Sequence, residues 1–216
     1  MKIIILTLMI FICFSQIAYA ERPMNEIPMY GGQHKPMVPE NIENSEGAAK
    51  LGWEYFYKGD LDTAIKRFNQ AWMFDRNSAD AFWGFGVIMG HRAYTEDVEK
   101  NIKESVRFLE KANSLSKNNA RIMVDLAYSE TLLASLLEEE NKSGFQKHYD
   151  KARKLFKKAE KLENDYPLVY ANWSILEFHE GNYVKAKTKL NTAIKLGYMP
   201  DPTYEKDLDE KLNVKN

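Results

Sequence analysis

The sequence has one cysteine, Cys13, in 216 residues, and it lies in the apolar stretch that opens the chain. A chain that loses this stretch has no thiol, which excludes disulfides, thiolate zinc sites, cysteine catalysis and thiol redox exchange. Its stability must then come from the core alone. An excess of one charge is also absent, since 30 basic and 31 acidic residues give a formal net charge of −1. Composition therefore makes no case for a nucleic-acid partner.

Sequence motifs for catalysis and cofactor binding are absent as well. The chain has no H-E-x-x-H, no G-x-S-x-G and no glycine-rich phosphate loop. Gly84 and Gly86 form only a bare G-x-G, and no two histidines have the i, i+4 spacing of a helical metal site. We therefore expect no catalytic residue, no metal and no cofactor. A cell-envelope hydrolase with a pocket built by insertions remains the enzyme alternative.

The first 20 residues are typical of a secretory signal peptide. Lys2 precedes an apolar stretch over residues 3–14, and Ala18 and Ala20 offer small residues for cleavage after Ala20. The apolar stretch is shorter than the roughly 20 residues that cross a bilayer. Because an exported chain without disulfides fits the bacterial periplasm best, we expect a periplasmic protein. An uncleaved anchor and a lipoprotein at Cys13 are the alternatives, although Ile12 stands where a lipoprotein signal requires a small residue.

Residues 21–43 are predicted to form an extended arm. This segment contains Pro23, Pro28, Pro36, Pro39 and a Gly31-Gly32 pair, with little hydrophobic periodicity. Helical periodicity begins near Asn44 and Ser45, which we expect to cap the first helix.

A repeated pattern follows the arm. From Ala48 to Ala71 the sequence reads A-x-x-L-G-x-x-Y, then a Gly-Asp turn, then A-x-x-x-F-x-x-A. The larger of these side chains are expected to fill the seam between two antiparallel helices: Leu51, Tyr55, Ala64 and Phe68. Gly52 and Ala71 are small where the helices press closest. This spacing resembles the tetratricopeptide repeat (TPR) family.

The resemblance covers residues 45–197 in four copies, which we delimit as 45–78, 79–119, 120–166 and 167–197. The second and third copies have enlarged segments around 91–101 and 138–145. Tyr204, Leu208 and Leu212 then recur every four residues within 198–216 and predict a short helix, 203–213, that covers the last open face. The resemblance therefore implies an all-α, right-handed solenoid of about four TPR-like helix pairs with a C-terminal capping helix.

The resemblance also implies a non-catalytic adaptor or scaffold whose concave groove, lined by the first helix of each repeat, binds a protein or peptide. Carried over by spacing, the groove residues are Trp53, Phe56, Trp83, Val87, Tyr128, Ile175 and Phe178, beside the smaller Ala49, Val124 and Ala171. These residues are aromatic or apolar, so we expect a ligand with hydrophobic anchors. The basic and Asn pattern of carboxylate-clamping TPR proteins is absent. The competing interpretation buries these aromatics against the enlarged segments or the arm.

Other interactions remain open. Residues 147–161 predict a basic amphipathic helix, either solvated or facing an acidic partner or membrane surface through Lys151, Lys154, Lys157, Lys158 and Lys161. A homo-oligomeric scaffold is a further alternative. The arm, with Ile27, Met29, Tyr30 and Val38, is hypothesised to occupy the groove as an internal placeholder.

Overall fold

The computed structural model describes residues 38–95 and 97–214, so the predicted signal peptide and most of the arm lie outside it. The described residues form nine α-helices and no strand. Their bounds are α1 Ile42–Tyr57, α2 Leu61–Phe74, α3 Ala79–Arg92, α4 Val98–Leu115, α5 Ala120–Glu139, α6 Phe145–Leu162, α7 Pro167–His179, α8 Tyr183–Lys195 and α9 Pro202–Val214. Within the described ranges, no helix is both long and apolar enough to cross a membrane.

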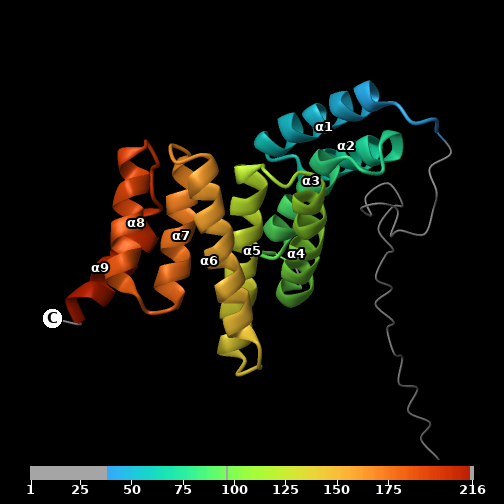
Figure 1. Cartoon of the computed structure of the whole chain (residues 1–216). Helices are drawn as coiled ribbons and strands as arrows, with labels where there is room; N and C mark the ends of the chain where they lie inside the picture. The colour runs from blue at the N-terminus through green and yellow to red at the C-terminus, as the bar shows by residue number, and fades with distance from the viewer. Residues whose placement is uncertain (1–37, 96, 215–216) are drawn as a thin grey trace, which may run out of the picture.

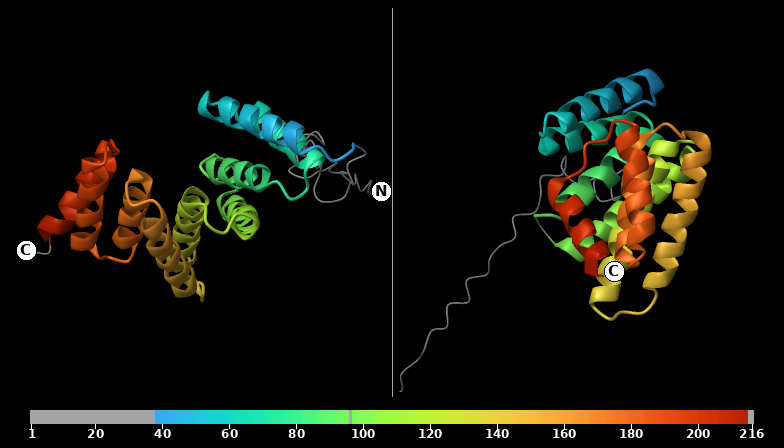
Figure 2. Two further views of the ribbon diagram at one scale, coloured as in Figure 1. Left: turned by 45° about the horizontal axis from the view of Figure 1, so that its top comes forward. Right: turned by 90° about the vertical axis from the view of Figure 1, so that its left-hand side faces the viewer.

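The first eight helices pack as four antiparallel pairs, α1 with α2, α3 with α4, α5 with α6 and α7 with α8. Each pair packs against the next along the chain, and α9 closes the end against α8 (Figure 1). The left view of Figure 2 shows successive pairs turning about the long axis of the molecule. The predicted all-α solenoid of TPR-like pairs with a C-terminal capping helix is therefore confirmed.

Side-chain caps set the helix starts. Asp60, Ser78, Asp97 and Asn119 each accept a hydrogen bond from a backbone N–H in the first turn of the helix that follows. The cap predicted for the first helix at Asn44 and Ser45 is wrong.

The α1 cap is Asn41, whose Oδ1 accepts from the Asn44 backbone N–H at 2.9 Å. The Ser45 hydroxyl instead lies buried inside α1 and donates to the Ala71 carbonyl at 2.9 Å. Ser45 therefore joins α1 to α2 rather than starting α1.

The seam of the first pair forms around Phe68, which is fully buried. A Cβ on Gly52 would lie 2.7 Å from the Phe68 ring, so the glycine is required by this close approach. Leu51 was predicted in the same seam, but it is 39% exposed. Its counterpart Leu126 in the third pair is buried by the preceding helix, where it packs with Leu109 of α4. Among the described residues, no helix precedes α1 to cover Leu51 in that way.

The enlarged segment of the third copy lengthens its helices more than its turn. α5 has 20 residues and α6 has 18, against 14 in α2. The turns between the paired helices span only residues 93–97 and 140–144. In Figure 1 the yellow end of the α5–α6 pair projects beyond the neighbouring helices. The extension therefore adds residues to the C-terminal end of α5.

Two glutamates are buried at equivalent repeat positions, 47 residues apart, where the first pair has Tyr55. Glu130 of α5 lies 2.5 Å from both His148 Nδ1 and Lys151 Nζ of α6. Glu177 of α7 pairs with Arg153 of α6. The Glu130 contacts thus hold α5 and α6 together within the third pair, whereas the Glu177–Arg153 ion pair joins the third pair to the fourth. His148 and His179 are half-buried, and each has a side-chain hydrogen-bond partner.

The capping helix contributes both apolar and polar contacts. Leu208 is fully buried beside Ala186 and Leu190 of α8. The Tyr204 hydroxyl lies 2.6 Å from the hydroxyl of Ser174 in α7. These contacts cover the last hydrophobic face of the solenoid.

Candidate functional site

A cavity of about 240 Å³ lies between α3, α4, α5 and α7, so it spans the second, third and fourth pairs. Each of these helices contributes side chains, and the turn after α3 adds Tyr94. The lining comprises Val87, Gly90, His91, Tyr94, Ser105, Leu109, Asp125, Tyr128, Ser129, Leu168 and Asn172. We call this the groove cavity. Its lining is mostly apolar and hydroxylic, with a few polar side chains, which is the usual composition of a ligand pocket.

Asp125 is the acidic residue in the lining of the groove cavity. Its carboxylate Oδ2 accepts a hydrogen bond from Trp83 Nε1 at 2.6 Å, a bond that joins α5 to α3. Burial raises the pKa of Asp125 to about 6, and the Trp83 N–H acts in the opposite direction by stabilising the carboxylate. The carboxylate is therefore held in surroundings that disfavour its charge.

Burial also disfavours the charged forms of His91 and Tyr128 in the groove cavity. Burial lowers the pKa of His91 below its ordinary value. The Tyr94 and Tyr128 hydroxyls lie 2.9 Å apart, and burial raises the pKa of Tyr128. Tyr166, near Asp125, has its pKa raised to about 12, again mainly by burial. Asp125 thus supplies the cavity's formal charge.

An aromatic wall leads from α1 to this cavity. The rings of Trp53 and Trp83 lie 4.6 Å apart in an edge-on arrangement. Phe56 meets the His91 ring at 5.0 Å, so the wall continues into the cavity lining. Edge-on aromatic pairs of this kind make a rigid surface with part of each ring still accessible.

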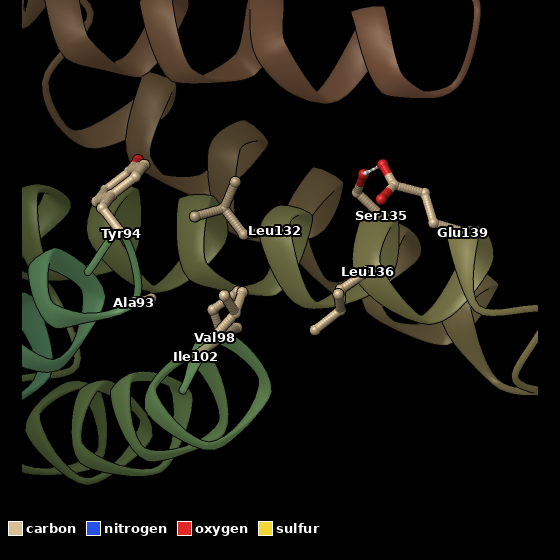
Figure 3. Close-up of a pocket in the computed structure, with 8 residues that line it drawn as sticks. All are labelled: Ala93, Tyr94, Val98, Ile102, Leu132, Ser135, Leu136 and Glu139. Carbon is tan, nitrogen blue, oxygen red and sulfur yellow. Dashed lines mark hydrogen bonds between the residues drawn. The ribbon is translucent and has the colours of Figure 1, made fainter. Parts of the chain in front are cut away.

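A second, apolar hollow of about 190 Å³ adjoins the first through Tyr94, which lines both. Figure 3 shows Val98 and Ile102 of α4 facing the Leu132 and Leu136 side of α5. Ser135 and Glu139, joined by a 3.3 Å hydrogen bond, lie at its far end. We call this hollow the apolar slot. The lengthened α5 builds much of it.

The structure places all seven predicted groove residues at half-buried positions. Val87 and Tyr128 line the groove cavity, and Trp53, Phe56 and Trp83 form the aromatic wall. Phe178 instead packs against Tyr183 and Tyr204 beside the capping helix, and Ile175 lies on α7 outside the cavity lining. The three smaller positions, Ala49, Val124 and Ala171, are buried.

Sequence reasoning missed Asp125, His91, Tyr94 and Asn172. Asp125 and Asn172 occupy one repeat position, 47 residues apart, directly after the predicted Val124 and Ala171. A polar residue recurring at a fixed repeat position beside the groove positions was the available signal.

The predicted basic surface divides into paired and solvated residues. Lys151 is half-buried in ion pairs with Glu110 and Glu130, and Lys158 donates to the Lys117 carbonyl at 2.8 Å. Lys154, Lys157 and Lys161 are exposed on α6. Lys157 also borders a cleft of about 440 Å³ between α6 and α8, where Arg153 is already paired with Glu177.

Comparison with known proteins returns structures alone: no protein-family model matches the chain, and no curated protein matches its sequence. A crystal structure of MamA is 18% identical, with a TM-score of 0.49, over 71% of this chain and 78% of that one. A second MamA crystal structure is 17% identical, with a TM-score of 0.48, over 74% and 80%. PilF of Pseudomonas aeruginosa is 18% identical, with a TM-score of 0.35, over 73% and 78%. At these identities the similarity concerns the arrangement of helices.

Proposed function

We propose that this protein is a non-catalytic adaptor that binds an extended peptide or a helix of a partner protein in its concave groove. The observation that carries the proposal is the continuous surface made by the aromatic wall, the groove cavity and the apolar slot. Half-buried aromatic side chains beside a preformed cavity are the features that anchor protein ligands. The signal-like first 20 residues support the bacterial periplasm as the place of action.

The test is crosslinked capture from a periplasmic extract of the cell that makes the protein. Wild type is compared with a Trp53→Ala/Trp83→Ala variant, which truncates the aromatic wall. A Val184→Ala/Met199→Ala variant is the matched control, because these apolar residues are 72% and 88% exposed outside the groove lining. Circular dichroism and thermal melting establish that each variant is folded.

We expect wild type and the control to capture the same partner, and the tryptophan variant to retain at least tenfold less of it. A tenfold loss corresponds to about 1.4 kcal/mol, and anchor residues at interfaces contribute more than about 1 kcal/mol each. Equal capture by a folded tryptophan variant would overturn the groove as the binding surface. Capture of nothing by wild type would remove the adaptor proposal itself.

A further inference from the structure

The carboxylate of Asp125 has one hydrogen-bond partner among the described residues, the Trp83 indole N–H. That bond occupies Oδ2. Asp125 lines the groove cavity, and its Oδ1 atom accepts no hydrogen bond from the described residues. A carboxylate has about four acceptor positions, so most of its capacity remains available to a ligand.

No described cation offsets this charge. Arg121 precedes Asp125 by one helical turn on α5, but its guanidinium pairs with Glu163 at 3.5 Å and stacks at 5.1 Å from the Tyr166 ring. Asp125 makes no ion pair within the described residues, and His91, across the cavity on α3, is neutral near pH 7. The contrast with Glu130 and Glu177 is direct, because both of those buried acids have a basic partner from α6.

The surroundings of Asp125 also suit a cation. The Trp83 indole is hydrogen-bonded to the carboxylate, and Tyr128 shares the cavity lining with Asp125. Aromatic faces attract an ammonium or guanidinium group. The Tyr94 hydroxyl, the Asn172 amide oxygen and the Ser129 hydroxyl supply further acceptors in the same lining. The apolar slot then lies on the far side of Tyr94, where it can receive an apolar neighbour.

We infer that the groove cavity binds a lysine or arginine side chain of the peptide ligand, with Asp125 as its counter-ion and the apolar slot receiving an adjacent apolar residue. The inference rests on the proposed function, because it names the chemistry that the groove selects. It is the opposite preference from a groove that clamps an acidic terminus. A ligand cation would satisfy the carboxylate that the chain itself leaves without an ion pair, and charge-assisted hydrogen bonds of this type are among the strong ones.

The experiment selects twelve-residue peptides displayed on phage against the purified protein. The same library is selected against Asp125→Asn, which keeps the shape of the side chain and an oxygen to accept from Trp83. Asp207→Asn is the matched control, since Asp207 is an exposed carboxylate on α9. The Trp53→Ala/Trp83→Ala variant shows which peptides use the groove.

We expect groove-dependent peptides to carry one enriched lysine or arginine near an apolar residue in the wild-type and Asp207→Asn pools. That enrichment should disappear in the Asp125→Asn pool. In synthetic copies of the best peptide, replacing lysine by norleucine, or arginine by citrulline, should weaken binding to wild type about tenfold or more. The same replacement should change binding to Asp125→Asn less than threefold.

Two results would overturn the inference, and only the second would also overturn the adaptor groove. Groove-dependent peptides without basic enrichment, or equal loss from the norleucine replacement in wild type and Asp125→Asn, would reject the cation site and leave the adaptor groove standing. A library that yields no groove-dependent peptide would reject both. The norleucine comparison on wild type tests the cation requirement even without a variant.

Discussion

At the scale of single residues, we expect Asp125 to lower the free energy of unfolding of the protein without a ligand. Its pKa rises from the ordinary 3.8 to about 6 on folding. The folded state therefore holds the proton more tightly than the unfolded state, and stability falls as the pH rises through this window. Asp125→Asn should increase the free energy of unfolding at pH 7.5 by roughly 1 to 2 kcal/mol. Urea denaturation at pH 7.5 and pH 4.5 measures the difference.

The gain should shrink at pH 4.5, because the wild-type carboxyl is then protonated in the folded protein and no longer carries a desolvated charge. Comparing the two variants at each pH cancels the titration of all other groups. A variant less stable than wild type at pH 7.5 would show that the carboxylate stabilises the fold. It would contradict the idea that Asp125 lowers stability in exchange for binding a ligand.

Gly84 is a second residue-scale case, since sequence reasoning set it aside as part of a bare G-x-G. A Cβ at Gly84 would lie 2.4 Å from the Phe68 ring, which is fully buried and has no room to move. Gly84→Ala should therefore destabilise the protein by about 2 to 3 kcal/mol, despite the better helix propensity of alanine.

Gly47→Ala is its matched control. Nothing lies within 4 Å of a Cβ at Gly47 in α1, so alanine there should stabilise the protein by about 0.5 to 1 kcal/mol. Denaturant midpoints measured for both variants separate close packing from propensity. Similar stabilities for the two variants would contradict the packing account.

At the scale of helices, the buried acids predict how consecutive pairs depend on each other. Glu177 of α7 is nearly fully buried and pairs with Arg153 of α6, which also reaches Glu180. Arg153→Met removes the cation and leaves a buried carboxylate uncompensated, which should cost about 3 kcal/mol. Adding Glu177→Gln to that variant should recover part of the loss. Equilibrium urea unfolding of the two variants and wild type measures both steps.

The result separates a buried ion pair from ordinary packing. If Glu177 is uncharged in the folded protein, Arg153→Met loses only its stem contacts, and the second substitution recovers nothing. Lys154→Met, at the next and exposed position of α6, is the control for removing a surface charge from the same helix.

The helices also show what a sequence pattern can and cannot reach. The pairing of α1 with α2 was predictable because Gly52, Ala64 and Phe68 lie in the seam between two helices that are neighbours in the sequence. Leu51 was mispredicted because its burial depends on a preceding pair, which a pattern within one repeat does not contain. Arg153, the partner of Glu177, comes from the preceding pair, and the cavity lined by Asp125 takes residues from four helices. Contacts of that range follow from how pairs stack, so periodicity along one helix leaves them out.

At the scale of the whole molecule, stacking decides both the binding surface and its stability. The groove cavity takes its lining from α3, α4, α5 and α7 and from the turn after α3, so no single pair contains the candidate site. Each pair mainly contacts its neighbours, and the stability of such an array is approximately a sum of local terms. A change at one end of the solenoid should therefore leave the opposite end protected while it alters the nearest pair.

The capping helix allows that expectation to be tested. Leu208 of α9 is fully buried against Leu190 of α8, so Leu208→Asp places a charge where α9 must dock. Native-state hydrogen exchange should show the opening free energy of α8 amides falling by about 3 kcal/mol, with the amides of α1 to α4 little changed. Val184→Asp, on the exposed start of α8, should leave both groups of amides unaffected. Equal loss of protection along the entire chain would instead show one cooperative unit. In that case the groove cavity, between the second and fourth pairs, would depend on the cap as strongly as α8 does.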